Sequence, residues 1–154
     1  MPIEDAAASR QRIGSVLVAL QFAAIGLLAW QAAPSFMATP APVAARGLLL
    51  VAVAVGTWAL HANRLGNFNI RPAPREGGAL VRHGPYRWVR HPMYTSVGCF
   101  AAACAVSAGT AAAAATAALL AAVLLAKSLL EERWMAQQHA GYADYRARTW
   151  RFVP

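Results

Sequence analysis

The chain has 154 residues, of which 58% are hydrophobic and 13% charged, and its formal net charge is +8. Soluble domains usually carry about 25% charged residues, and the mean hydropathy of this chain is positive, at +0.41. The long apolar runs exclude a soluble fold with one basic face, so the positive charge does not indicate nucleic-acid binding. We therefore expect an integral membrane protein with no nucleic-acid partner.

Two apolar runs in the first half of the chain are each long enough to cross a bilayer. The first covers residues 13–33, and its polar residues are Ser15, Gln21 and Gln31. This run is not followed by a small-residue cleavage site and a polar mature domain. We therefore interpret it as a retained helix and not as a signal peptide. The proline-rich segment 33–42 is expected to end this helix, and a second helix is predicted over residues 43–62.

Residues 63–91 form a connection that is too polar to cross a bilayer. It holds one acid, Glu76, three prolines and six arginines: Arg64, Arg71, Arg75, Arg82, Arg87 and Arg90. Lys and Arg concentrate in cytoplasmic loops, whereas the segment 33–42 is uncharged. We therefore expect this loop and both termini to be cytoplasmic, in a multi-pass protein of a prokaryotic inner membrane.

The second half of the chain predicts a helical hairpin. Apolar sequence resumes at Pro92 and is interrupted only at residues 107–110, so helices are predicted over residues 92–107 and 110–130. Small side chains let membrane helices approach closely, and we expect the Ala-rich second arm to pack against protein on most sides. The polar and aromatic tail, residues 131–154, suits an interfacial helix broken near Gly141.

These elements predict an all-α, polytopic fold with about four transmembrane helices, a C-terminal helical hairpin and a cytoplasmic cofactor pocket, all in one membrane domain, residues 1–154. An even number of crossings agrees with two cytoplasmic termini. The spacing of Cys99 and Cys104 fits neither a CxxC pair nor a zinc site, so we interpret them as small buried hydrophobic residues. No metal site is predicted, and the oligomeric state is left open.

Polar chemistry is concentrated in RHGPYRWVRHPMY, residues 82–94, where the loop meets the third helix. Pro92 suits the first position of a helix, so Arg90 and His91 would lie at its N-terminus. Free backbone N–H groups and the positive end of the helix dipole make this a candidate site for a carboxylate or phosphate. The alternative is that the Arg and Trp side chains only anchor the helix at the headgroups.

Two adjacent acids, Glu131 and Glu132, end the second arm of the hairpin, where the helix dipole disfavours them. Lys127 precedes Glu131 by four residues, which is the weaker orientation for a helical ion pair. Because a hairpin brings its two ends together, we expect these acids and RHPMY to face one pocket. One glutamate would bind hydroxyls or an ammonium of a cofactor and the other a basic residue, beside flat surfaces from Tyr86, Trp88 and Tyr94.

These motifs resemble the isoprenylcysteine carboxyl methyltransferase family of integral-membrane enzymes, which are related to phospholipid N-methyltransferases. The resemblance covers roughly residues 67–154. It rests on NFN at 67–69, LVRHGPYRWVRHPMY at 80–94, the two adjacent glutamates, YADY and the terminal FVP. It implies S-adenosylmethionine as methyl donor, bound on the cytoplasmic side, and a lipophilic acceptor that enters from the membrane lipids.

By position, the resemblance implies cofactor contacts at Gly78, Ala79, Leu80, Val81, Tyr86, His91, Pro92, Met93, Tyr94 and Glu131. Supporting roles are expected for Gly84, Arg90 and Glu132. The segment matching GALV begins with His in eukaryotic relatives, so no side-chain contact is expected from Gly78. Lys127 stands where those relatives have an Arg associated with the prenylcysteine carboxylate; it keeps the charge but loses the bidentate fork.

Methyl transfer from a sulfonium is an in-line displacement that needs alignment and a dry pocket, so we assign no catalytic residue. We expect His91 to be a cofactor ligand and not a general base, because a helix start lowers its proton affinity. The predicted activity is closest to carboxyl O-methylation of an isoprenylcysteine-type substrate. The alternatives are methylation of a phospholipid or a small hydrophobic amine or thiol, an NADPH-dependent sterol-type reductase, and a non-catalytic scaffold.

Overall fold

The computed structural model describes residues 2–38, 40–63 and 80–153, with the backbone alone for residues 2–10 and 38. Within these ranges the regular elements are helices, apart from one isolated bridge. The helices are α1 (Pro2–Ala38), α2 (Val43–Asn63), the 3-10 helix η2 (Gly84–Arg87), α3 (Pro92–Ala108), α4 (Ala111–Gln138) and α5 (Tyr142–Ala147). The predicted all-α fold is confirmed.

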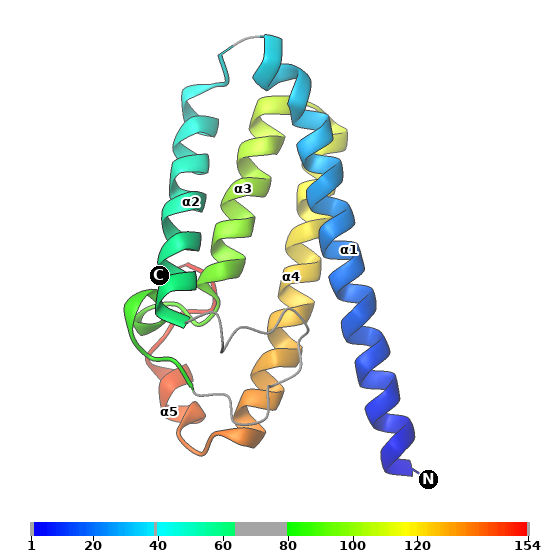
Figure 1. Ribbon diagram of the computed structural model, residues 1–154, viewed down its shortest axis with the longest axis vertical. Coiled ribbons are helices and arrows are strands. Elements are labelled where there is room, and N and C mark those ends of the chain that lie inside the picture. The colour runs from blue at the N-terminus through cyan, green and yellow to red at the C-terminus, as the bar shows by residue number, and fades with distance from the viewer. Residues whose placement is uncertain (1, 39, 64–79, 154) are drawn as a thin grey trace.

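Three helical segments are long and apolar enough to cross a membrane: Gln11–Met37, Val43–Asn63 and Ala111–Gln138. The apolar helix α3 has 17 residues and rises about 26 Å at 1.5 Å per residue, slightly less than a hydrocarbon core of about 30 Å. α1 to α4 run along the long axis of the molecule, with α5 at the lower end (Figure 1). The predicted polytopic membrane architecture is therefore confirmed.

α1 does not end at residue 33, where the proline-rich segment begins, as predicted. It continues through Pro34 to Ala38. Proline removes one backbone hydrogen bond and normally breaks a helix, but it is tolerated in membrane helices, where neighbouring groups satisfy the freed carbonyl. The chain leaves the helix only before α2 begins at Val43.

α4 differs from its prediction in two respects. It buries one face, and the remaining alanines, such as Ala114, Ala115 and Ala118, are exposed, so the expectation of packing on most sides is wrong for this chain. The helix also continues beyond residue 130 to Gln138, because KSLLEERWMAQQ is rich in strong helix formers. Glu131 and Glu132 therefore lie before the last turn of α4. At that position the helix dipole disfavours a carboxylate less than it does in the last turn.

The hairpin turn lies where the sequence predicts it. α3 ends at Gly109, whose φ of 62° is in the left-handed region that glycine adopts without a steric cost. Thr110 caps α4, since its side chain accepts a hydrogen bond of 3.2 Å from the N–H of Ala113. This tight turn places the start of α3 and the end of α4 at the same end of the bundle, as Figure 1 shows.

α2 and α3 approach closely at Gly56. The Ser96 hydroxyl donates a 2.6 Å hydrogen bond to the carbonyl of Ala52. A Cβ at Gly56 would lie 2.7 Å from the same hydroxyl oxygen. Small residues at such a contact let membrane helices pack through their backbones.

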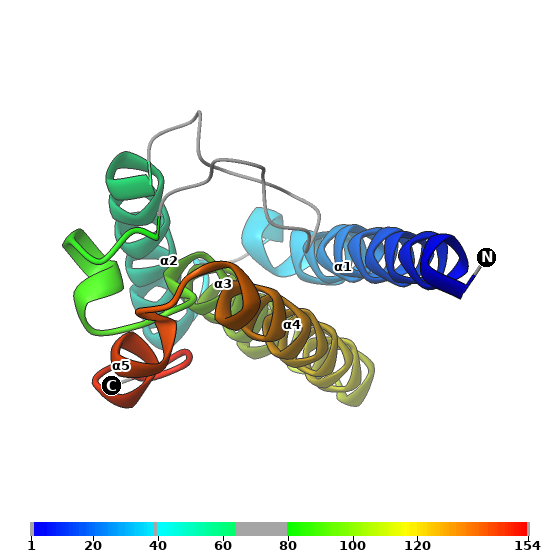
Figure 2. The ribbon, with the colours of Figure 1, turned by 90° about the horizontal axis from the view of Figure 1, so that it is seen from below.

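The C-terminal tail returns to the start of α3. The N–H groups of Arg90 and His91 donate to the carbonyls of Trp150 and Arg151 at 2.8 and 3.1 Å. The guanidinium of Arg151 donates two hydrogen bonds, of 3.0 and 2.9 Å, to Glu132 on α4. Seen from below, α5 and the chain end lie beside α2 and the start of α3, away from α1 (Figure 2). The tail thus joins α3 to α4.

We expect Gly56→Ala to destabilise the protein by about 1–3 kcal/mol, the usual cost of overpacking, because the new methyl group displaces the Ser96 hydroxyl. Gly47 lies on the same helix, and a Cβ added there would meet no neighbouring atom within 4 Å. Gly47→Ala is the matched control and should be neutral or slightly stabilising. Thermal unfolding in detergent measures both, and equal melting temperatures would contradict the close contact.

We expect Arg151→Gln to release the tail, because it removes a charged partner from the buried carboxylate of Glu132. Limited proteolysis should then cut the tail several times faster than in the wild type. Arg148 is exposed on the same tail and forms no ion pair among the described residues, so Arg148→Gln is the control. Equal cleavage rates in the two variants would show that the ion pair does not hold the tail.

Candidate active site at the foot of the hairpin

Side chains from the start of α3 and from α4 meet at one end of the hairpin. The Tyr94 hydroxyl donates to Glu131 Oε1. His91 lies between the two acids, with Nδ1 3.4 Å from Glu131 Oε2 and Nε2 3.2 Å from Glu132 Oε1. RHPMY and the two glutamates are therefore in direct contact, as expected from the hairpin.

The two glutamates have different environments. The Glu132 side chain is 4% exposed and bonds to Arg90, at 2.9 Å, as well as to Arg151 and His91. A buried carboxylate is stable only when it is paired in this way, so Glu132 is fully engaged within the protein. The Glu131 side chain is 23% exposed, and it retains acceptor capacity for a bound molecule.

His91 departs from the sequence prediction of a lowered proton affinity. Burial lowers its pKa, but the hydrogen bonds and charges of Glu131 and Glu132 outweigh burial and raise the pKa above the ordinary value of 6.5. A protonated ring would donate from both nitrogens, and a carboxylate oxygen lies beside each of them. Both ring nitrogens of His91 thus face carboxylates of the protein.

The start of α3 is less open to an anion than the sequence indicates. The N–H of His91 is bonded to the Arg151 carbonyl, and the N–H groups of Tyr94 and Thr95 are bonded to the His91 carbonyl. Pro92 has no N–H. The donors that were expected to be free are therefore largely used within the chain.

The loop before α3 is held between α2 and α5. Gly84 has a φ of 60°, and a Cβ there would lie 2.8 Å from the Cβ of Ala62 on α2. On the other side, Tyr145 of α5 donates a 2.8 Å hydrogen bond to the Tyr86 carbonyl. Burial, then the neighbouring Tyr145 and Glu131, raise the pKa of Tyr86 to about 12. The Tyr86 phenol is therefore neutral and within electrostatic reach of Glu131.

Lys127 lies over the ring of Tyr94. Its ammonium is 5.1 Å from the Tyr94 ring centroid and donates a 2.5 Å hydrogen bond to Gln21 Oε1 on α1. Gln21 is not among the site residues expected from the sequence. The available signal was a carboxamide in an apolar helix, since polar groups in membrane helices turn toward polar partners.

The remaining predicted site residues divide into three groups. Pro92 is buried in the first turn of α3, and Leu80, Val81 and Met93 are partly buried. Trp88 was expected to supply a flat surface beside Tyr94. Its ring packs instead against Trp58 of α2, with a centroid distance of 5.7 Å. Gly78, Ala79 and the NFN motif at 67–69 lie outside the described residues.

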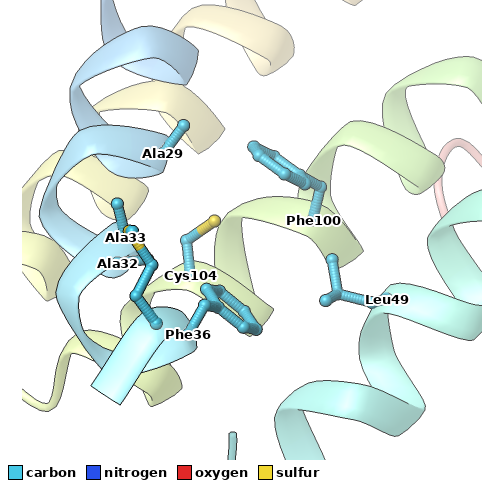
Figure 3. Close-up of a pocket in the computed structure, with 8 residues that line it drawn as sticks. Ala29, Ala32, Ala33, Phe36, Leu49, Phe100 and Cys104 are labelled. Carbon is cyan, nitrogen blue, oxygen red and sulfur yellow. The ribbon is translucent and has the colours of Figure 1, made fainter. Parts of the chain in front are cut away.

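An apolar cavity of about 370 Å³ lies farther along the bundle, between α1, α2 and α3. Figure 3 shows Phe36, Phe100, Leu49 and Cys104 around a common space. Phe100 is about 9 Å farther along α3 than Tyr94, at 1.5 Å per residue. In the part of the chain that the structure describes, no cluster of three or more His, Cys, Asp or Glu residues suits a metal ion.

A family model described as phospholipid methyltransferase matches residues 42–141. The matched segment contains α2, α3, α4 and the cluster around His91, Tyr94 and Glu131, whereas α1 and the tail lie outside it. No curated protein matches the chain. Because the model matches most of the chain's length, the chain belongs to the phospholipid methyltransferase family. At that level it is a membrane methyltransferase, in agreement with its long apolar helices.

Proposed function

We propose that the protein transfers a methyl group from S-adenosylmethionine to a lipophilic acceptor, and that this reaction is most like carboxyl O-methylation of an isoprenylcysteine-type substrate. The observation that carries the proposal is the partly open Glu131, held by Tyr94 and His91 at the foot of the hairpin. This cluster lies within the segment that matches the methyltransferase family.

The donor set fits S-adenosylmethionine. An open carboxylate at Glu131 suits the ammonium group or the ribose hydroxyls of the cofactor. The ring of Tyr86 offers a flat face for the sulfonium or the adenine. The Tyr94 ring is stacked on His91, with 5.4 Å between centroids, and has the Lys127 ammonium 5.1 Å from its centroid, so its contact with the cofactor would be through the hydroxyl group. We assign cofactor contacts to Gly78, Ala79, Leu80, Val81, Tyr86, His91, Pro92, Met93, Tyr94 and Glu131. Supporting roles fall to Gly84, Arg90 and Glu132.

Bound S-adenosylmethionine supplies an electrophilic methyl group on a sulfonium. The protein's own residues hold and orient the reactants: Glu132, Arg90 and Arg151 fix α3 against α4 and the tail. His91 has a carboxylate beside each ring nitrogen, so neither nitrogen is free to remove a proton from an acceptor. A carboxylate acceptor has no proton to lose, and the Lys127 ammonium would attract it. These charges favour an acidic acceptor over an amine.

A lipophilic acceptor is supported by the apolar surroundings of the site. The bundle contains an apolar cavity of about 370 Å³, and large apolar side chains such as Trp30, Leu50 and Val53 face outward. The start of α1 and α5 lie toward the end of the bundle at which α3 begins (Figure 1). Because Lys and Arg are enriched in cytoplasmic loops, we propose that this end is cytoplasmic.

We expect Glu131→Gln to weaken S-adenosylmethionine binding roughly 10- to 100-fold, since a hydrogen bond to a charged group contributes about 1.5–3 kcal/mol. Equilibrium binding of labelled cofactor to purified protein measures the effect. Asp144→Asn, an exposed carboxylate-to-amide change on α5, is the control and should bind like the wild type. Unchanged affinity in Glu131→Gln would overturn the assignment of this carboxylate.

Membranes containing the protein should transfer label from methyl-labelled S-adenosylmethionine to a lipid-extractable product. A carboxyl methyl ester releases its label as methanol in alkali, whereas an N-methyl or S-methyl product retains it. We expect alkali-labile label that S-adenosylhomocysteine suppresses and NADPH does not. Alkali-stable label would indicate an amine or thiol acceptor, and inhibition by NADPH alone would favour a reductase.

A further inference from the structure

Phe152, near the end of the tail, lies against His91 and has no part in the proposed function so far. Its ring packs against the His91 ring at a tilt of 56°, with 6.0 Å between the centroids. The backbone N–H of His91 donates a 3.1 Å hydrogen bond to the carbonyl of Arg151, the residue before Phe152. Since the family match ends at residue 141, membership of the family assigns no role to Phe152.

The backbone of Phe152 is held in place on both sides of its ring. Its carbonyl accepts a hydrogen bond from the hydroxyl of Thr95, which lies in the first turn of α3. Before it, the guanidinium of Arg151 donates to both carboxylate oxygens of Glu132. The contact between the Phe152 and His91 rings therefore follows from the way the tail docks on α3 and α4.

Hydrogen bonds alone hold the His91 ring weakly. Its Nδ1 is 3.4 Å from Glu131 Oε2 and its Nε2 is 3.2 Å from Glu132 Oε1, whereas a charged N–H···O bond is normally about 2.7–2.9 Å long. Ring packing supplies the missing constraint. Tyr94 is stacked on the imidazole, with an angle of 4° between the planes, and Phe152 contacts it at a steep tilt. Two rings at different angles restrict the imidazole more than one stacked ring does.

The position of the His91 ring bears on Glu131, the carboxylate assigned to the cofactor. Glu131 Oε1 accepts a hydrogen bond from the Tyr94 hydroxyl, and Oε2 faces Nδ1 of His91. If the imidazole moved, Oε2 would lose its neighbour and the carboxylate could turn about the bond to Tyr94. A small misplacement of a binding group is costly, so the orientation of Glu131 toward a cofactor depends on His91.

We propose that Phe152 is a positioning residue of the cofactor site, which fixes the His91 ring and, through it, the Glu131 carboxylate. This inference rests on the proposed function for the identity of the bound molecule. The tail then contributes to cofactor binding through one side chain, in addition to joining α3 to α4.

Equilibrium binding of labelled S-adenosylmethionine to the whole chain, purified in detergent, tests the proposal. Phe152→Ala should raise the Kd roughly three- to tenfold, which is the range that one aromatic pair contributes. Phe152→Tyr keeps the ring and should restore binding to the wild-type level. Val153 is the next residue and is 67% exposed, so Val153→Ala is the matched control and should bind like the wild type.

The ring nitrogens of His91 give a second readout that needs no cofactor. Nitrogen NMR of protein with labelled histidine reports their environment, and comparison with His91→Asn assigns the signals. Phe152→Ala should shift the His91 signals, and Val153→Ala should leave them unchanged. Wild-type affinity or unshifted His91 signals in Phe152→Ala would overturn the inference.

Limited proteolysis separates positioning from release of the tail. Phe152→Ala retains the bonds from Arg151 to Glu132 and from Thr95 to the carbonyl of residue 152, so its tail should be cut at the wild-type rate. A loss of affinity that comes with faster cleavage would indicate a merely structural role and would also overturn the inference. If the wild type binds no S-adenosylmethionine but the His91 signals shift as expected, the proposed function fails and the positioning of His91 by Phe152 stands.

Discussion

The buried carboxylate of Glu132 is the constraint on which the arrangement of the site depends. A carboxylate that is 4% exposed must be balanced by cations and hydrogen-bond donors, and Glu132 obtains them from Arg90, His91 and Arg151. These partners belong to the start of α3 and to the tail, so one charge joins two segments to α4. The neighbouring Glu131 is then fixed beside Tyr94 with one side open.

The hairpin and its chemical consequence could be predicted from the sequence. Uninterrupted apolar runs and the turn at residues 107–110 were enough to bring RHPMY and the two glutamates to one end, because an antiparallel hairpin allows no other arrangement of its ends. The tail could not be placed, since it docks partly through backbone hydrogen bonds of Arg90 and His91, which any residue can make. Gln21 was also missed, because helix periodicity does not say which neighbour a single polar side chain meets.

The two charged regions of the site suit a reaction that removes charge. A positively charged sulfonium would lie near the carboxylate of Glu131, and an anionic acceptor near the ammonium of Lys127. In the proposed reaction, methyl transfer would convert a cation and an anion into a neutral thioether and a neutral ester. Because charge would be lost as the transition state forms, apolar surroundings would favour this step more than bulk water does.

The hydrogen bond between Lys127 and Gln21 also bears on how the chain is assembled. α1 precedes α4 in the sequence, so during synthesis the first helix is in the membrane before the segment that carries the buried lysine arrives. Insertion scales place the cost of a lysine at the centre of an isolated membrane helix at about 2.5–3.5 kcal/mol. The carboxamide on α1 gives that ammonium a polar partner in the folded bundle. The first helix, which the family match does not include, thus offsets part of the cost of burying the lysine of α4.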